Sequence, residues 1–142
     1  MAFLKKLMKA VQIWSRLPIL EKSLAIEVWF DLLVVAMLLR TPFHRHLIRH
    51  NPIVKQQNSL IQPADVIELV DAVALLHIKK MTCLERALVA KRALRRRGAD
   101  VILRIGVSHN LEQFEAHAWL EHNGKAFDES ANRYSILRKP SA

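Results

Sequence analysis

The sequence predicts an α+β fold in which packed N-terminal helices precede a central helix that lies against a small antiparallel sheet. Apolar residues recur at helical spacing over most of the chain, the pattern turns to extended runs after Gly98, and only 3 glycines and 5 prolines occur. A length of 142 residues with 51% hydrophobic side chains suits one domain over 1–142. We expect a helical part over 1–80 and an α+β core over 81–137.

The N-terminal segment mixes lysines with apolar residues, as export signals do. Lys5, Lys6 and Lys9 interrupt the apolar run, Pro18 follows it, and no small-residue cleavage site appears. We therefore expect an amphipathic first helix instead of a signal peptide, and a cytoplasmic protein. The sequence leaves open whether this first helix also touches a membrane.

The most apolar stretch runs from Leu24 to Leu39 and contains Glu27 and Asp31, and it is shorter than the roughly 20 apolar residues of a membrane span. The two carboxylates are four residues apart and so share one helix face, where they would be solvated or paired. Thr41-Pro42 ends this helix, because the residue before a proline is driven out of the helical region. We expect a buried amphipathic helix here.

Pro63 opens a second core helix. The apolar stripe of this helix consists of Val66, Leu69, Val70, Val73 and Leu76. The preceding residues are polar and irregular. His46 and His50 would share a helix face there, but no carboxylate or thiol ligand is near, so we expect a basic surface and not a metal site.

A capping box marks the start of the third helix. Thr82 is followed three residues later by Glu85, which puts Thr82 at the N-cap and Cys83 at the first helical position. Gly98 follows three arginines whose charges suit a helix C-terminus, so the helix should span 83–97. The face below Cys83 carries Ala87, Ala90 and Leu94, and its small residues let another layer approach closely.

Cys83 is the only cysteine, which excludes an intramolecular disulfide and makes a reducing cytosol the natural compartment. At a helix N-terminus the unpaired N–H groups and the helix dipole favour the thiolate, which is the nucleophilic form. A free cysteine is, however, more often a small buried hydrophobe. A catalytic interpretation therefore requires a base nearby.

Asn123-Gly124 between two extended runs predicts a two-residue hairpin. With these two residues as the turn, Trp119 lies opposite Asp128. His117 and Asp128 then share a face as diagonal neighbours about 7 Å apart, which two side chains can close into a hydrogen bond.

The same register sets His117 opposite Ser130 and points Glu129 to the other face, whereas a bulge would exchange the two acids. Asp128 is the expected partner of His117, with Glu129 as the alternative. We expect His117 to face the helix that carries Cys83. The opposite face, to be covered by the N-terminal helices, would then hold Phe114, Ala116, Ala118, Leu120 and Phe127.

Residues 83–107, CLERALVAKRALRRRGADVILRIGV, and 116–130, AHAWLEHNGKAFDES, resemble the transglutaminase-like cysteine proteases that remove leader peptides in lasso-peptide biosynthesis, the microcin-processing family. In that family the cysteine at the start of the helix is the nucleophile, the histidine of AHAW is the base, and an acid on the next strand orients the histidine. The resemblance implies a transglutaminase/papain-like core with the triad Cys83, His117 and Asp128. We expect neither a cofactor nor a metal.

The resemblance further implies a split system, in which a separate leader-recognition protein presents the precursor's leader peptide and a cyclase later closes the ring. The thiolate would attack the peptide carbonyl after the leader, His117 would protonate the leaving amine, and water would hydrolyse the thioester. The backbone N–H of Cys83 would supply one oxyanion donor. Polar candidates for a second donor are Gln56, Gln57 and Gln62.

Two other functions remain open. The net charge of +9 is compatible with a basic binding module without catalysis. This module would use the residues around 44–50 and Arg92, Arg95, Arg96 and Arg97. The basic stretches lack interleaved aromatic residues, which argues against nucleic acid as the partner. The third possibility keeps the site but passes the acyl group to an amine, and the sequence does not separate water from an amine as acceptor.

Overall fold

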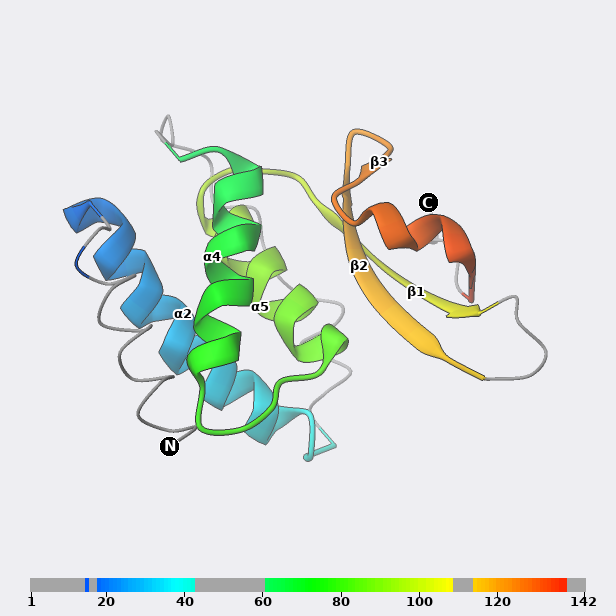
Figure 1. Ribbon diagram of the computed structural model, residues 1–142, viewed down its shortest axis with the longest axis horizontal. Helices are drawn as coiled ribbons and strands as arrows, with labels where there is room; N and C mark the ends of the chain where they lie inside the picture. Colours follow the sequence, from blue (N-terminus) through cyan, green and yellow to red (C-terminus); the bar gives the residue numbers. More distant parts are fainter. Residues whose placement is uncertain (1–14, 16–17, 43–60, 109–113, 138–142) are drawn as a thin grey trace.

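The computed structural model describes residues 15, 18–42, 61–108 and 114–137. These residues form three helices and a four-stranded antiparallel sheet, so the predicted α+β class is confirmed. In chain order the elements are α2 (Ile19–Leu38), α4 (Pro63–Leu76), α5 (Cys83–Arg96), β1 (Ile102–Ser108), β2 (Ala116–His122), β3 (Lys125–Ala126), the 3-10 helix η1 (Glu129–Arg133) and β4 (Tyr134–Ile136). In Figure 1 the three helices lie on one side and the curled sheet lies on the other. Of the helices, α5 contacts both the other two helices and the sheet.

The helix boundaries follow the local signals closely. Pro63 occupies the first turn of α4, where its missing N–H costs nothing. Gly98 adopts a φ of 80° just after α5, the left-handed conformation that ends a helix. The helix α2 begins earlier than its apolar pattern indicated, directly after Pro18. The expected N-terminal helix and the region of His46 and His50 lie outside the described residues.

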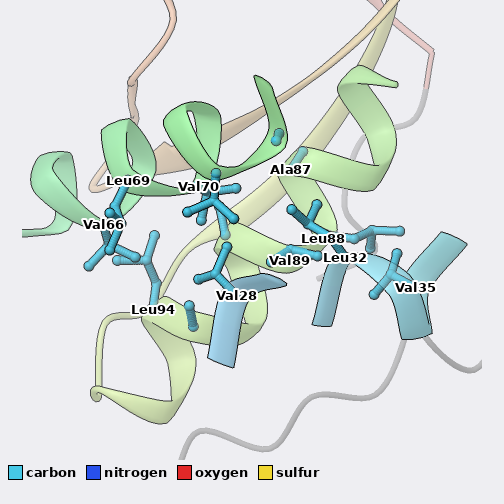
Figure 2. Packing of buried hydrophobic residues seen from close by; sticks show 14 of the residues in the cluster. Val28, Leu32, Val35, Val66, Leu69, Val70, Ala87, Leu88, Val89 and Leu94 are labelled. Atoms are coloured by element: carbon cyan, nitrogen blue, oxygen red, sulfur yellow. The ribbon is translucent and has the colours of Figure 1, made fainter. Parts of the chain in front are cut away.

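The hydrophobic core lies where the three helices meet. Figure 2 shows valine and leucine side chains of α2, α4 and α5 packed together. The fully buried members include Val28, Leu32, Val35, Val66, Val70, Leu88, Val89 and Leu94. Each such side chain contributes roughly 1.5–3 kcal/mol when it leaves water. This packing makes α5 the central helix, and it holds the N-terminus of α5 in place.

Ion pairs between α2 and α5 fix the orientation of the two helices. Arg96 donates to both Glu27 and Asp31, with its Nη1 2.8 Å from Asp31 Oδ2. Arg97 and Arg92 reach the same two carboxylates. Asp31 is only 9% exposed, so the arginines neutralise a carboxylate that would otherwise be buried alone. The two carboxylates that the sequence placed on one helix face are therefore paired.

The sheet has the strand order β3-β2-β1-β4. The predicted hairpin register is confirmed, because Glu121 pairs with Ala126 and His122 with Lys125. Asn123 and Gly124 have φ values of 50° and 77°, which is the backbone that a two-residue turn between twisted strands requires. The described helices include none that is long and apolar enough to cross a membrane.

Two details of the predicted hairpin are wrong. The extended run does not continue to Ser130, because β3 ends at Ala126 and the chain enters η1 at Glu129. Asp128 caps this 3-10 helix, and its carboxylate accepts the backbone N–H of Ser130. Local capping by an aspartate thus prevails over continued strand pairing. As a result, His117 pairs with no residue on the β3 side, and Glu129 does not follow strand alternation.

The predicted surroundings of the two β2 faces are wrong in part. Ala118 and Leu120 are 6% and 4% exposed and belong to the core that contains α5, so α5 and not the N-terminal helices covers this face. Phe127 packs against the same core. Phe114 is 85% exposed and Ala116 is also exposed. The apolar alternation of β2 therefore points toward the central helix, and the face of His117 carries aromatic rings instead.

Candidate active site

A cavity of about 340 Å³ lies between α4, α5 and the open edge of β2. The three residues singled out from the sequence, Cys83, His117 and Asp128, all line it. They come together although His117 is not on the face of β2 that packs on α5. Because β3 ends after two residues, β2 is a sheet edge next to His117, and side chains from both faces of the strand reach the same space.

Cys83 is held at the cavity by a complete capping box. The Thr82 hydroxyl accepts the N–H of Glu85 at 3.2 Å, and Glu85 Oε2 accepts the N–H of Thr82 at 2.7 Å. Lys79 donates to the other oxygen of Glu85. Burial raises the pKa of Glu85, but the bonds from Lys79 and Thr82 outweigh it, so the net pKa is lowered. The first turn of α5 is thereby fixed, and Cys83 is half-buried at its first position.

The first turn of α5 also leaves backbone donors beside the thiol. The N–H of Glu85 is taken by Thr82 Oγ1, and the N–H of Arg86 begins the helical bonding by donating to the Thr82 carbonyl. The N–H groups of Cys83 and Leu84 precede that point and have no acceptor within the helix. Among the glutamines considered as a second oxyanion donor, Gln62 is exposed at the N-cap of α4 and outside the cavity lining. Gln56 and Gln57 lie outside the described residues.

The ring of His117 is bound by Asp128 through one nitrogen. His117 Nε2 lies 2.6 Å from Asp128 Oδ2. Asp128 Oδ1 meanwhile accepts the N–H of Ser130 at 2.8 Å, so both carboxylate oxygens are used and the group cannot rotate freely. An ionised carboxylate only accepts hydrogen bonds, so Nε2 carries the proton and Nδ1 keeps its lone pair.

Asp128 is electrostatically suited to stay ionised. Partial burial raises the pKa of its carboxyl, but hydrogen bonds from Ser130 and His117 outweigh that effect, and the pKa falls below its usual value. A negative charge beside the imidazole stabilises the imidazolium that forms when His117 takes up a proton. Glu129 also lines the cavity, but it is exposed and makes no hydrogen bond to His117.

Two aromatic rings, which the sequence did not indicate as part of the site, pack against the His117 ring. The His117 ring stacks on Trp119, with 6.1 Å between centroids, and lies 5.0 Å from the centroid of Tyr134. The Trp119 ring and the Tyr134 Cβ both pass close to Gly106, where an added Cβ would lie 2.9 Å from each. A lone glycine within a strand pattern indicates such a close approach. Gly106 is therefore the residue of the sequence from which this packing could have been predicted.

An ion pair between Arg86 and Asp71 also lies at the cavity and was not predicted from the sequence. Arg86 Nη1 donates to Asp71 Oδ1 at 2.9 Å, and both side chains line the cavity. Arg86 comes three residues after Cys83 on α5 and so lies on the same helix face. In the described residues Cys83 Sγ and His117 make no hydrogen bond, and catalytic bonds of free enzymes often form only when substrate binds.

Within the described residues, His, Cys, Asp and Glu form no cluster of three that could hold a metal ion. The arrangement of a thiol at a helix N-terminus, an imidazole with a free Nδ1 and a carboxylate behind it suits nucleophilic acyl transfer. Each of these groups comes from a different element, and all line one cavity.

Residues 27–139 match the family described as the transglutaminase-like superfamily. Comparisons with curated proteins and with solved structures give no significant match. Because the matched region covers most of the chain, the protein belongs to the transglutaminase-like superfamily. This membership favours an activity of the cysteine peptidase or acyltransferase type.

Proposed function

We propose that this protein is a cysteine protease that removes the leader peptide from the ribosomally made precursor of a lasso peptide. The observation that carries the proposal is the convergence of Cys83, His117 and Asp128 on one cavity, with His117 held by Asp128 at 2.6 Å. The resemblance of residues 83–107 and 116–130 to the microcin-processing proteases supplies the substrate class.

In the proposed reaction, Cys83 Sγ gives its proton to His117 Nδ1 and attacks the carbonyl carbon of the last leader residue. The oxyanion that forms accepts hydrogen bonds from the N–H groups at the start of α5. His117 passes the proton to the leaving amine of the core peptide, which departs, and a thioester remains on Cys83. Water then attacks the thioester with His117 as base, and the leader leaves as a carboxylic acid.

The proposal includes two partners. A separate leader-recognition protein would present the precursor, and a cyclase would act on the released core peptide. We expect this chain alone to cleave generic substrates poorly, because the binding energy for the part of the leader away from the scissile bond would come from the recognition protein.

Of the alternative, a non-catalytic basic binding module, the structure describes the four arginines, and each of them is already paired with a carboxylate. Arg92, Arg96 and Arg97 are engaged by Glu27 and Asp31 of α2. Arg95 contacts Asp100. Guanidinium groups already paired with carboxylates of the same chain are less available to phosphate or an acidic protein.

The direct test is incubation of the protein with a candidate precursor and its recognition protein, followed by mass spectrometry. The proposal expects two fragments whose masses sum to the precursor plus one water, and no cleavage by Cys83→Ala or His117→Ala. A product that has gained an added amine in place of water would identify an acyltransferase. An intact precursor in the presence of a recognition protein that binds its leader would contradict both.

A further inference from the structure

A second cavity, of about 390 Å³, adjoins the proposed active site. It is formed by the end of α4, the segment that follows it and the start of α5. Asp71 and Arg86 line both cavities, so their ion pair is a wall that the two spaces share. A substrate that occupies the first cavity therefore has the second one directly beside it.

The lining of the second cavity combines apolar and cationic groups. Leu75 and Ile78 are 70% and 86% exposed, an unusual state for large aliphatic side chains so close together. The charged residues of the lining are one carboxylate, that of Asp71, and three cations, those of Lys79, Lys80 and Arg86. The cavity thus has a surplus of positive charge beside apolar surface.

The three cations differ in how many of their hydrogen-bond donors are already paired with carboxylates. Lys79 is paired with Glu85. Lys80 is exposed and has no carboxylate partner within the described residues. Arg86 uses a single N–H on Asp71, whose side chain is half exposed, and its buried Nε has no acceptor. Lys80 and Arg86 therefore retain hydrogen-bonding capacity for an added carboxylate.

The distance to the nucleophile fits a peptide. Arg86 is three residues beyond Cys83, which is about 4.5 Å along the helix axis at 1.5 Å per residue. An extended peptide advances roughly 3.3 Å per residue. A substrate side chain one to three residues from the scissile carbonyl would therefore reach Arg86, and Lys80 lines the same cavity.

We propose that the second cavity is a substrate subsite that holds an acidic side chain of the peptide next to an apolar one. This inference rests on the proposed function, because it takes the occupant to be the same peptide that Cys83 cleaves. Lys80 and Arg86 bind the carboxylate, while Leu75 and Ile78 contact the neighbouring apolar side chain.

Binding to the Cys83→Ala variant tests the subsite without requiring turnover. The probes are fluorescein-labelled peptides of alanine and leucine that differ only in one central residue, which is glutamate, glutamine or lysine. We expect the glutamate peptide to bind about tenfold more tightly than the glutamine peptide, as for one charge-assisted contact. Equal binding of the two, or no binding of either, overturns the proposal.

A charge exchange excludes a general effect of net charge. Adding Lys80→Glu to the Cys83→Ala background should abolish the preference for the glutamate peptide and favour the lysine peptide. The matched control, Lys22→Glu on α2, makes the same change in net charge, lies outside both cavity linings and should keep the preference. A preference that survives Lys80→Glu, or that Lys22→Glu also removes, counts against the subsite.

The two proposals fail in distinguishable ways. If the wild-type protein cleaves a precursor but binds glutamate and glutamine peptides equally, the subsite is wrong and the protease stands. If the glutamate preference depends on Lys80 but no precursor or peptide is cleaved, the cavity binds an acidic side chain of a peptide, and the proposed protease activity is wrong.

Discussion

Asp128 binds His117 through Nε2, at 2.6 Å, and not through Nδ1. The choice of nitrogen matters because it decides which side of the ring keeps a lone pair. With Nε2–H bound to the carboxylate, Nδ1 is the nitrogen available to a thiol. Asp128 is fixed in turn as the N-cap of η1, where its carboxylate accepts the N–H of Ser130. The local structure around Asp128 therefore prepares His117 to act as a base.

Asp128→Asn should lower the rate of leader removal by orders of magnitude, up to about 10⁴-fold, with little change in thermal stability. The amide carries no charge to stabilise the imidazolium and permits the wrong tautomer. Single-turnover cleavage measured by mass spectrometry, with circular dichroism for the fold, checks this. Glu129→Gln is the matched control and should retain nearly full activity. The reverse result would assign the orienting role to Glu129.

Gly106→Ala should impair both stability and activity. The added Cβ would meet Ser135 O at 2.8 Å, and the Trp119 ring and the Tyr134 Cβ at 2.9 Å, so the two residues whose rings pack on His117 must move. Overpacking of this kind costs roughly 1–3 kcal/mol. Urea unfolding and cleavage rates would be compared with those of Gly124→Ala.

Gly124 makes a useful comparison because a Cβ there meets nothing within 4 Å and the substitution acts only through the φ of 77°. We expect Gly124→Ala to cost about 1 kcal/mol of stability and to leave the cleavage rate of the folded protein unchanged. Equal activity loss in the two alanine variants would mean that the aromatic packing on His117 is irrelevant to catalysis.

Arg96→Ala should destabilise the protein by about 1–3 kcal/mol, because the buried Asp31 loses its nearest cation. The measurement is the free energy of unfolding in urea at pH 7. Arg40→Ala, at an exposed position after α2, should change it by less than about 0.5 kcal/mol. If the Arg96 variant is as stable as the Arg40 variant, the ion pairs between α2 and α5 do not support the fold.

Acid should weaken the fold through Glu85. Its pKa in the folded protein lies below the usual 4.5, so at low pH the unfolded chain binds more protons than the folded one. The stabilisation is complete above about pH 4.5 and is lost as the pH falls through the folded pKa. Urea unfolding between pH 7 and 3 should show this decline in the wild-type protein.

Glu85→Gln should lower stability at pH 7 by about 1–2 kcal/mol, since a neutral amide pairs poorly with Lys79, and should reduce the acid-induced decline. The exposed Glu68→Gln is the control and should keep the wild-type profile. An unaltered decline in the Glu85 variant would place the acid sensitivity elsewhere.

Much of the site was predictable because its determinants are local. Thr82 and Glu85 form their capping box within four residues, and Asn123-Gly124 fixes the hairpin through its own backbone. From these two signals follow the position of the thiol and the closeness of His117 to Asp128. Local chemistry of this kind does not depend on how the elements pack.

The errors arose where packing decides. The sequence predicted that His117 faces α5, but Ala118 and Leu120 are the residues of β2 that bury apolar area against this helix. His117 reaches the cavity from the edge of β2, which is open only because Asp128 starts a 3-10 helix. The strand β4, which brings Tyr134 to His117, has too short a pattern to be recognised. The domain division at residue 80 stays a prediction.

The rate at which iodoacetamide alkylates Cys83 tests the central claim most directly, because Cys83 is the only cysteine and the label needs no mapping. At neutral pH we expect the folded protein to react on the order of tenfold faster than the urea-unfolded chain, despite the partial burial of the thiol, and His117→Ala to remove the advantage. A folded protein that reacts no faster than the unfolded chain, or an advantage that persists in His117→Ala, would contradict the assignment of Cys83 and His117 as nucleophile and base.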